Sequence, residues 1–392
     1  MQRVSPNQIH RCAELKSSNE EFIQKLVKDS RKLYSKGLPI IFTLRHLSKL
    51  TDVNFKYLHS IVGKKINPYN NFSINKARGG KRNISSPNFY LRRVQDFIKQ
   101  EILDTNYVSS QISESVFSYR KALSIVDNAK FDIGAKWIIK TDIENFFDSI
   151  KEYHIYHFFH SLGYASLLSL ELSRLVTWPS FDINFDLGLS QDRSLNEDIT
   201  FTSKYKFYCS SDVIGSLPQG APTSPQLSNI IFSPIDEKFK ILSEEYGYIY
   251  TRYADDLFFS TRNNIDINSA RNLLNEVRYI LNSSNYKMNN KKTKIILPRA
   301  KKVITGIVIT DDKILLDRKF KDEIKMNIFF AEKNGLEAQR KFIKFHGNTH
   351  TFLKYLLGKL NFANQVEPDF ANIWKKRLLN LAKNSGFTMI YY

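Results

Sequence analysis

Cysteine is nearly absent from this chain, and long apolar runs are missing from it. Two cysteines, Cys12 and Cys209, occur in 392 residues, which excludes a disulfide framework and a cysteine zinc site. No apolar run reaches the length of a membrane span, and the segment after Met1 lacks the apolar core of a signal peptide. These absences predict a protein of the reducing cytoplasm with no membrane partner.

Acidic residues are too few to balance the basic ones. Lysine and arginine number 58 against 39 aspartates and glutamates, which gives a formal net charge of +19. An excess of that size favours a polyanionic partner, and phosphate backbones are the commonest polyanions. The hydrophobic share of 42% is ordinary for a globular protein. The length allows two or three subdomains.

Two adjacent carboxylates stand between two apolar, aromatic-rich segments. Residues 248–260 are predicted to form a β-hairpin with Asp255 and Asp256 at its turn. Taken alone, an Asp-Asp pair is more often a polar hairpin tip. A third carboxylate, Asp142, ends the apolar strand predicted over residues 136–142. Three carboxylates in this pattern indicate phosphoryl transfer with two Mg²⁺ ions.

A second predicted hairpin, over residues 73–87, alternates apolar and basic side chains around Gly79-Gly80. It is either a solvated basic hairpin or a clamp for a triphosphate, because arginine forks suit phosphate oxygens. An amphipathic helix is predicted behind it, over residues 91–102. The hairpin carries four cations, which are Lys76, Arg78, Lys81 and Arg82.

Together these segments resemble a known family. Tyr253-Ala254-Asp255-Asp256 matches the Tyr-x-Asp-Asp signature of reverse transcriptases, and segment 136–150 matches their motif A. Gly79-Gly80-Lys81-Arg82 matches the fingers of the bacterial enzymes. The resemblance runs from about residue 37 to about residue 381, and it includes motifs B, D and E at 216–225, 286–295 and 302–309.

The segment before motif A resembles the retron branch of that family. Retron enzymes carry an Asn-Ala-x-x-His signature there, and Asn128 and Ala129 match its start. Asp132 stands where the signature has histidine, which leaves the subfamily open. One alternative is a group II intron-type reverse transcriptase, although we expect no room for a maturase region after the thumb. The other alternative is a non-catalytic nucleic-acid-binding protein.

The resemblance implies an α+β fold, namely a right-hand polymerase with fingers, a palm of antiparallel sheet plus helices, and a helical thumb. Polar residues 181–211 show no clear period and are predicted to be a fingers-type insertion of unassigned role. The last thumb helix, beginning at Pro368, is expected to bury Ile373 among its apolar residues. The predicted domains are an N-terminal helical extension (1–65), fingers (66–135), palm (136–310) and thumb (311–392).

The resemblance also implies an activity and the residues that perform it. The reaction would be RNA-directed DNA synthesis from dNTPs with two Mg²⁺ ions. The template-primer would be a structured noncoding RNA, copied into multicopy single-stranded DNA (the cDNA) in anti-phage defence alongside an effector protein. Lys292 would be either a general acid for the leaving pyrophosphate or a solvated lysine. Predicted catalytic metal ligands are Asp142, Asp255 and Asp256; predicted nucleotide-binding residues are Arg82, Lys76, Arg78, Phe147 and Gln219; predicted primer- or RNA-binding residues are Asn128, Thr305 and Gly306.

Two neighbouring aromatic residues are candidates for one role. Phe147 follows Asp142 by five residues, where reverse transcriptases place a ring beneath the sugar of the nucleotide. Such a ring leaves no room for a ribose 2′-hydroxyl. We therefore expect Phe147 to exclude ribonucleotides and Phe146 to be a core residue, with the reverse assignment as the alternative.

Overall fold

The structure is a computed structural model that describes residues 19–75, 79–179 and 214–387. The chain forms two compact units, and each is assembled from separate stretches of sequence. The domain boundaries predicted after residues 65, 135 and 310 differ from the boundaries of these units. The predicted domains therefore stay predictions. The predicted insertion 181–211 lies outside the described residues. The first unit comprises residues 1–119, 143–239 and 277–289, and the second comprises 120–142, 240–276 and 290–392.

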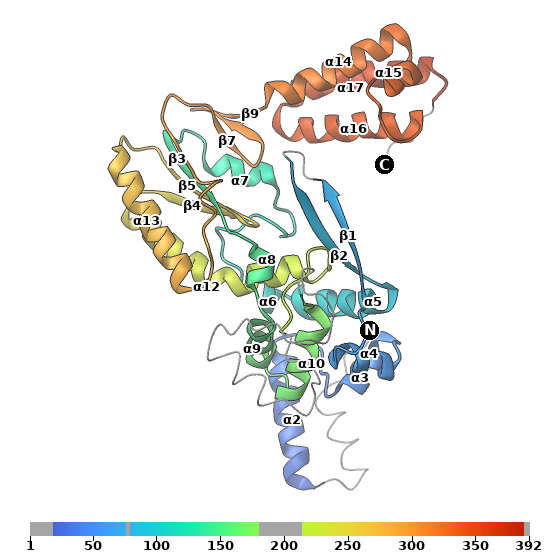
Figure 1. The fold of residues 1–392 in the computed structure, drawn as a ribbon, viewed down its shortest axis with the longest axis vertical. Coiled ribbons are helices and arrows are strands. Elements are labelled where there is room, and N and C mark those ends of the chain that lie inside the picture. Colours follow the sequence, from blue (N-terminus) through green and yellow to red (C-terminus); the bar gives the residue numbers. More distant parts are fainter. Residues whose placement is uncertain (1–18, 76–78, 180–213, 388–392) are drawn as a thin grey trace. The chain divides into compact units, whose positions relative to one another are not determined.

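The first unit is mostly helical and contains the basic hairpin (Figure 1). The side chain of Asn88 accepts a hydrogen bond from the backbone of Leu91 and thereby begins helix α5. Strands β1 and β2 pair antiparallel, and Gly79-Gly80 directly before β2 have positive φ angles that glycine adopts without strain. The predicted hairpin is confirmed. The elements are α2 (Glu20–Ser35), α3 (Leu44–Thr51), α4 (Phe55–Val62), β1 (Tyr69–Asn75), β2 (Lys81–Pro87), α5 (Phe89–Ile98), the π-helix η1 (Lys99–Leu103), α6 (Asn106–Ser109), α8 (Phe146–Ser149), α9 (Glu152–Leu162) and α10 (Ser166–Val176).

A buried ion cluster holds helices of the first unit together. Glu152 at the start of α9 is completely buried and accepts hydrogen bonds from Lys64 Nζ at 2.7 Å and Arg174 Nε at 2.8 Å. Arg174 also donates to the carbonyl of Val62, and the backbone of Gly215 donates to Glu152. Burial alone would raise the pKa of Glu152, but the charges of Lys64 and Arg174 hold that pKa below its usual value.

The second unit contains the sheet that carries the acidic residues. Its strand order is β4-β5-β3-β6, and all neighbours are antiparallel. Val126 and Ala129 of α7 share a hydrophobic cluster with Ile138 of β3 and Phe258 of β5. A smaller antiparallel sheet, β7-β8-β9, joins the same cluster. The elements are α7 (Ile125–Phe131), β3 (Trp137–Asp142), β4 (Ile249–Tyr253), β5 (Asp256–Thr261), β6 (Lys294–Ile296), β7 (Lys302–Ile304), β8 (Ile307–Ile309) and β9 (Ile314–Leu316).

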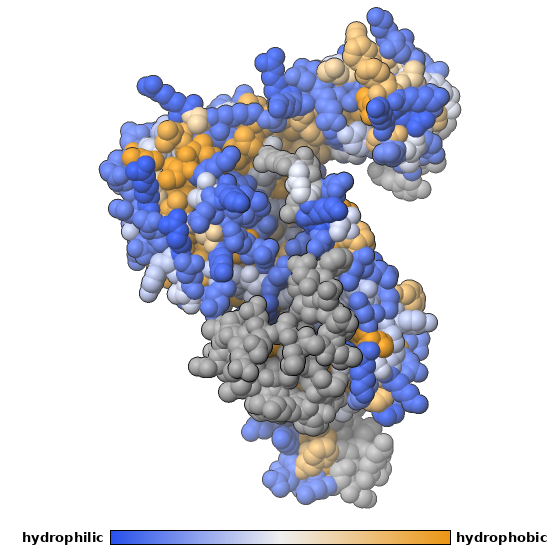
Figure 2. All heavy atoms as spheres, in the orientation of Figure 1, coloured by the Kyte–Doolittle hydropathy of each residue, from blue (hydrophilic) through white to orange (hydrophobic). Residues whose placement is uncertain are grey.

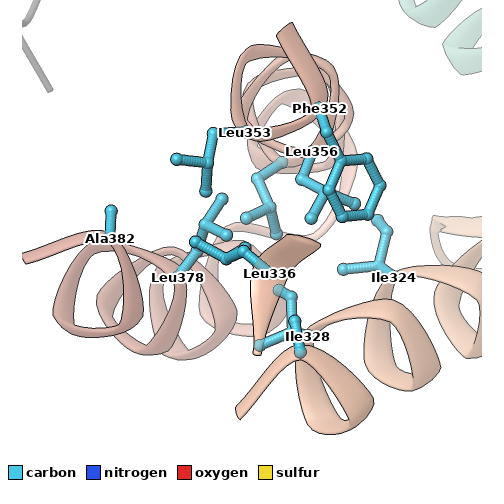
Figure 3. Close-up of a cluster of buried hydrophobic side chains, with 10 residues drawn as sticks. Ile324, Ile328, Leu336, Phe352, Leu353, Leu356, Leu378 and Ala382 are labelled. Carbon is cyan, nitrogen blue, oxygen red and sulfur yellow. The ribbon is translucent and has the colours of Figure 1, made fainter. Parts of the chain in front are cut away.

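Two long helices belong to both units, since α12 (Ser224–Glu245) begins in the first and α13 (Ile267–Ser283) begins in the second. The C-terminal part of the second unit is a helical bundle, drawn in orange and red in Figure 1. Side chains from all of its helices point toward one another in its core (Figure 3). The helical thumb predicted for this region is therefore confirmed as a helical bundle. Its helices are α14 (Arg318–Asn334), α15 (Leu336–Phe342), α16 (Thr349–Val366) and α17 (Pro368–Asn384).

One residue of α17 does not follow the prediction. Ile373 is 61% exposed, so its predicted place in the core is wrong. The helix turns Ala371, Leu378 and Ala382 toward the bundle, and at 3.6 residues per turn Ile373 falls outside that stripe. Apolar character alone therefore misplaced Ile373.

The face drawn in Figure 2 is mostly hydrophilic, with smaller hydrophobic areas between. Within the described ranges, no helix combines the length and the apolar character that crossing a membrane requires.

Candidate active site

Asp142 and Asp256 lie directly opposite each other on neighbouring strands. Asp142 ends β3, Asp256 begins β5, and the two residues are partners in the antiparallel register. Asp255 lies in the two-residue loop between β4 and β5. The first loop residue, Ala254, has a φ of 56°, as a type II′ hairpin turn requires at that position. The strand pairing thus places Asp142 beside Asp256 and next to the turn that carries Asp255, and the role of these residues as metal ligands stays a prediction.

Asp142 and Asp256 oppose the ionisation of Asp255. Burial and the charges of Asp142 and Asp256 raise the pKa of Asp255 to about 6. A hard divalent cation prefers oxygen ligands and would relieve this repulsion, so the donor set fits Mg²⁺. Among the described residues, however, no three His, Cys, Asp or Glu side chains are already close enough together to hold a metal ion.

Two lysines pair with Asp142 and Asp256. Lys292 Nζ donates to Asp142 Oδ2 at 2.7 Å, and Lys140 Nζ lies 3.0 Å from Asp256 Oδ1. Burial alone would lower the pKa of Lys292, but its hydrogen bond with Asp142 and the surrounding negative charge raise it. The sequence motifs predicted Lys292 as a site residue but not Lys140. The available signal was the alternation along β3, which places residues 140 and 142 on one face.

A buried arginine supports the turn that carries Asp255. Arg252 of β4 is completely buried, and its Nη1 donates to the carbonyl of Ala254 at 3.1 Å. On strand β3, the hydroxyl of Thr141 lies 2.7 Å from that of Thr293. This contact fixes the segment that carries Lys292 beside β3. Neither Arg252 nor Thr293 was predicted.

In the first unit, the β1–β2 hairpin packs against the motif B turn. The backbone of Ser85 donates to the carbonyl of Gln219 at 2.7 Å. A Cβ atom on Gly220 would lie 2.8 Å from Ile84 Cγ2 and 3.0 Å from the carbonyl of Ser85, so only glycine permits this approach. Arg82 is exposed and shares a face of β2 with Ile84. The structure thereby brings the Arg82 strand and Gln219 together.

The two neighbouring aromatic residues differ in burial. Phe146 is 3% exposed and packs on Phe232 and Tyr286, with ring centroids 5.4 and 6.4 Å away. Phe147 is only partly buried. The core role expected for Phe146 is confirmed, and the ring of Phe147 keeps an accessible surface. The other nucleotide-binding candidates, Lys76 and Arg78, lie outside the described residues.

Similarity to a known protein family shows which enzymes have this arrangement of residues. A family described as reverse transcriptase (RNA-dependent DNA polymerase) matches residues 74–349, which is more than half of the chain. The chain belongs to the reverse transcriptase family. It is therefore an enzyme, an RNA-directed DNA polymerase, and its α+β right-hand fold class is as predicted.

Curated relatives show that this reverse transcriptase is of the retron type. It is 30% identical to the retron Ec86 reverse transcriptase of Escherichia coli over 321 residues, which cover 80% of this chain and 87% of that protein. The retron Ec83 reverse transcriptase of Escherichia coli is 25% identical over 310 residues, or 79% and 86% of the two chains. A solved foamy viral protease-reverse transcriptase in complex with double-stranded DNA has 14% identity and a TM-score of 0.41, covering 83% of this chain and 40% of that one. This last likeness is too distant to carry an argument.

Three residues of the reverse transcriptase were predicted to bind the primer or RNA. Two of them lie in a turn, and the third lies in the interior. Thr305 and Gly306 form the turn between β7 and β8, with φ angles of 48° and 89°, and Thr305 Oγ1 donates to the carbonyl of Ile125. Asn128 is completely buried, and its side-chain amide has no hydrogen-bond partner in the described part of the chain. A contact between Asn128 and RNA would require α7 to move. These assignments stay predictions.

Asp132, which replaces the histidine of the retron signature, is buried at the end of α7. Burial raises its pKa to about 7, and Ser260 and Arg262 offset this only in part. The folded pKa lies above the usual value of 3.8. The contribution of Asp132 to the free energy of unfolding is therefore complete below about pH 4 and is lost as the pH rises through 7. Asp132→Asn cannot ionise, so its free energy of unfolding should gain on wild type by about 1.4 kcal/mol per pH unit between pH 5 and 7.

Urea unfolding at several pH values measures this difference. Asp312→Asn, at an exposed position of the same unit, is the control for the loss of a carboxylate from the surface. A pH-independent difference for Asp132→Asn would contradict the prediction.

Proposed function

We propose that this reverse transcriptase copies part of a structured noncoding RNA into multicopy single-stranded DNA in the cytoplasm, within a retron anti-phage defence system that includes an effector protein. Similarity to retron enzymes over most of both chains supports this substrate. The observation that carries the chemistry is the register pairing of Asp142 with Asp256 beside Asp255 in the turn.

Asp142, Asp255 and Asp256 would hold two Mg²⁺ ions. When bound, the ions would favour ionisation of the attacking hydroxyl and neutralise charge on the leaving pyrophosphate. The raised pKa of Lys292 keeps its ammonium protonated at neutral pH. Lys292 would give its proton to the leaving pyrophosphate as a general acid, although the raised pKa makes its ammonium a weaker acid.

The remaining predicted residues would position the substrates. Arg82 would bind the triphosphate of the dNTP with its two-pronged guanidinium, with Lys76 and Arg78 adding positive charge on the same hairpin. Gln219 would contact the incoming nucleotide, and the hairpin contact at its carbonyl supports this role. Asn128, Thr305 and Gly306 are proposed to act on the primer or RNA.

Sequencing the nucleic acid that co-purifies with the enzyme tests the proposed product. We expect DNA joined to a 2′-hydroxyl of RNA and released by a debranching enzyme, and primer extension on RNA that requires Mg²⁺. The group II intron-type alternative predicts DNA extended from a free 3′-hydroxyl, with no branch. Recovery of unbranched DNA alone would rule out the retron product while leaving polymerase activity intact.

The partly buried ring of Phe147 predicts discrimination between sugars. If the ring fills the space beneath the sugar, a ribonucleotide binds only by displacing packed atoms, which typically costs about 1–3 kcal/mol. Phe147→Ala should therefore lower the preference for dNTP over rNTP roughly ten- to hundredfold. The measurement is the ratio of kcat/KM for the two substrates on one RNA template.

Phe146→Ala is the matched control for this measurement. Because Phe146 is a core residue, its removal should cost about 3–5 kcal/mol of stability and should leave the substrate ratio of the remaining folded enzyme unchanged. A changed ratio in Phe146→Ala with an unchanged ratio in Phe147→Ala would assign the sugar contact to the other ring.

A further inference from the structure

Lys140 is a charged residue at the carboxylate site that the proposed mechanism does not use. It lies on β3, two residues before Asp142, and its side chain is 27% exposed. Its ammonium contacts Asp256 Oδ1 at 3.0 Å and lies 4.9 Å from the ring centroid of Phe258. The ring and the carboxylate together hold the cation in one place, since an aromatic face attracts an ammonium group.

The two lysines contact different carboxylates of the site. Lys292 neutralises Asp142 and Lys140 neutralises Asp256. The side chain of Lys140 is 27% exposed and that of Lys292 is 56% exposed, whereas Asp256 is 28% and Asp142 5% exposed. Both ion pairs are therefore partly shielded from solvent. A divalent cation that binds Asp256 through Oδ1 must therefore displace the ammonium group of Lys140 or be repelled by it.

We propose that Lys140 is an internal counter-ion of the metal site, which holds Asp256 in the nucleotide-free enzyme and competes with the divalent cation for that carboxylate. This inference rests on the proposed role of the three aspartates as metal ligands. It makes Lys140 a positioning residue that disfavours metal loading until a triphosphate brings additional oxygen ligands.

Mn²⁺ binding to the full-length enzyme without nucleic acid or nucleotide tests the proposal, with free Mn²⁺ measured by electron paramagnetic resonance. Lys140→Met should tighten Mn²⁺ binding about tenfold, because a nearby positive charge is removed at a partly buried site. Lys140→Gln, which keeps a polar side chain, should do the same. Lys140→Arg retains the charge and should bind Mn²⁺ as wild type does.

Lys294→Met is the matched control, because Lys294 is the register partner of Lys140 on β6 and is exposed. It should change Mn²⁺ affinity by less than about twofold. Adding Asp256→Asn to Lys140→Met should abolish the gain. Unchanged or weaker Mn²⁺ binding in both neutral Lys140 variants, or an equal gain in Lys294→Met, would overturn the role of Lys140.

A separate variant distinguishes failure of this inference from failure of the metal site itself. Asp255→Asn should weaken Mn²⁺ binding strongly. If it does so while the Lys140 variants bind as wild type, only the counter-ion role fails. If Asp255→Asn binds Mn²⁺ as well as wild type, the assignment of the aspartates fails, and the counter-ion role fails with it.

Discussion

Replacing Asp255 or Asp256 with asparagine should reduce DNA synthesis by about a thousandfold or more, because metal-held charge in the transition state is worth several kcal/mol. RNA binding should change by less than about twofold, since it rests on many separate phosphate contacts. The measurements are single-turnover primer extension with Mg²⁺ and RNA binding at a fixed salt concentration.

Asp29→Asn is the control for these variants, because Asp29 is a half-exposed carboxylate on α2 in the other compact unit. It should extend primers as wild type does. Extension near the wild-type rate by either Asp255→Asn or Asp256→Asn would refute the assignment of that residue to the catalytic site. A parallel loss of RNA binding would instead point to a damaged fold.

Glu152→Gln is expected to lower the free energy of unfolding by about 3–5 kcal/mol at neutral pH, because Lys64 and Arg174 would remain buried without their counter-charge. The contribution of Glu152 is complete above its usual pKa and is lost as the pH falls through the lowered folded pKa. The difference between wild type and variant should therefore shrink in acid. Chemical denaturation across the pH range measures it.

The surface pair Arg318–Asp322 provides the contrast. Its side chains are 90% and 48% exposed, so Asp322→Ala should cost at most about 0.5 kcal/mol. Added salt should weaken this small effect and leave the effect of Glu152→Gln nearly unchanged, because buried charges are screened little. A loss below about 1 kcal/mol in Glu152→Gln would mean that relaxation or water compensates the buried cations.

Local sequence patterns specify the elements that carry the chemistry. Alternating strands with Asp142 at the end of one and Asp255-Asp256 at a turn predicted the hairpin and the metal-ligand candidates. Gly79-Gly80 predicted the turn of the basic hairpin, and the retron-like segments predicted the family. These features are local, because a turn, a strand or a signature is specified by a few consecutive residues.

Which side chains come into contact depends on how the elements pack. Lys292 and Asp142 are 150 residues apart in the chain, and Lys64 and Glu152 are 88 apart. No short pattern encodes such pairs, because each depends on how separate elements pack. The same holds for burial, which separated Phe146 in the core from the more accessible Phe147 and left Ile373 exposed on α17.

Lys140 shows where local pattern ends and packing begins. Its place on β3 follows from the strand period, which puts it on the same face as Asp142. Its ion pair with Asp256 follows only from the register of β3 against β5. Register is a property of two strands together, because a slip of one residue would turn every side chain to the other face. The sequence of β3 alone therefore specified the lysine, and the assembled sheet specified its partner.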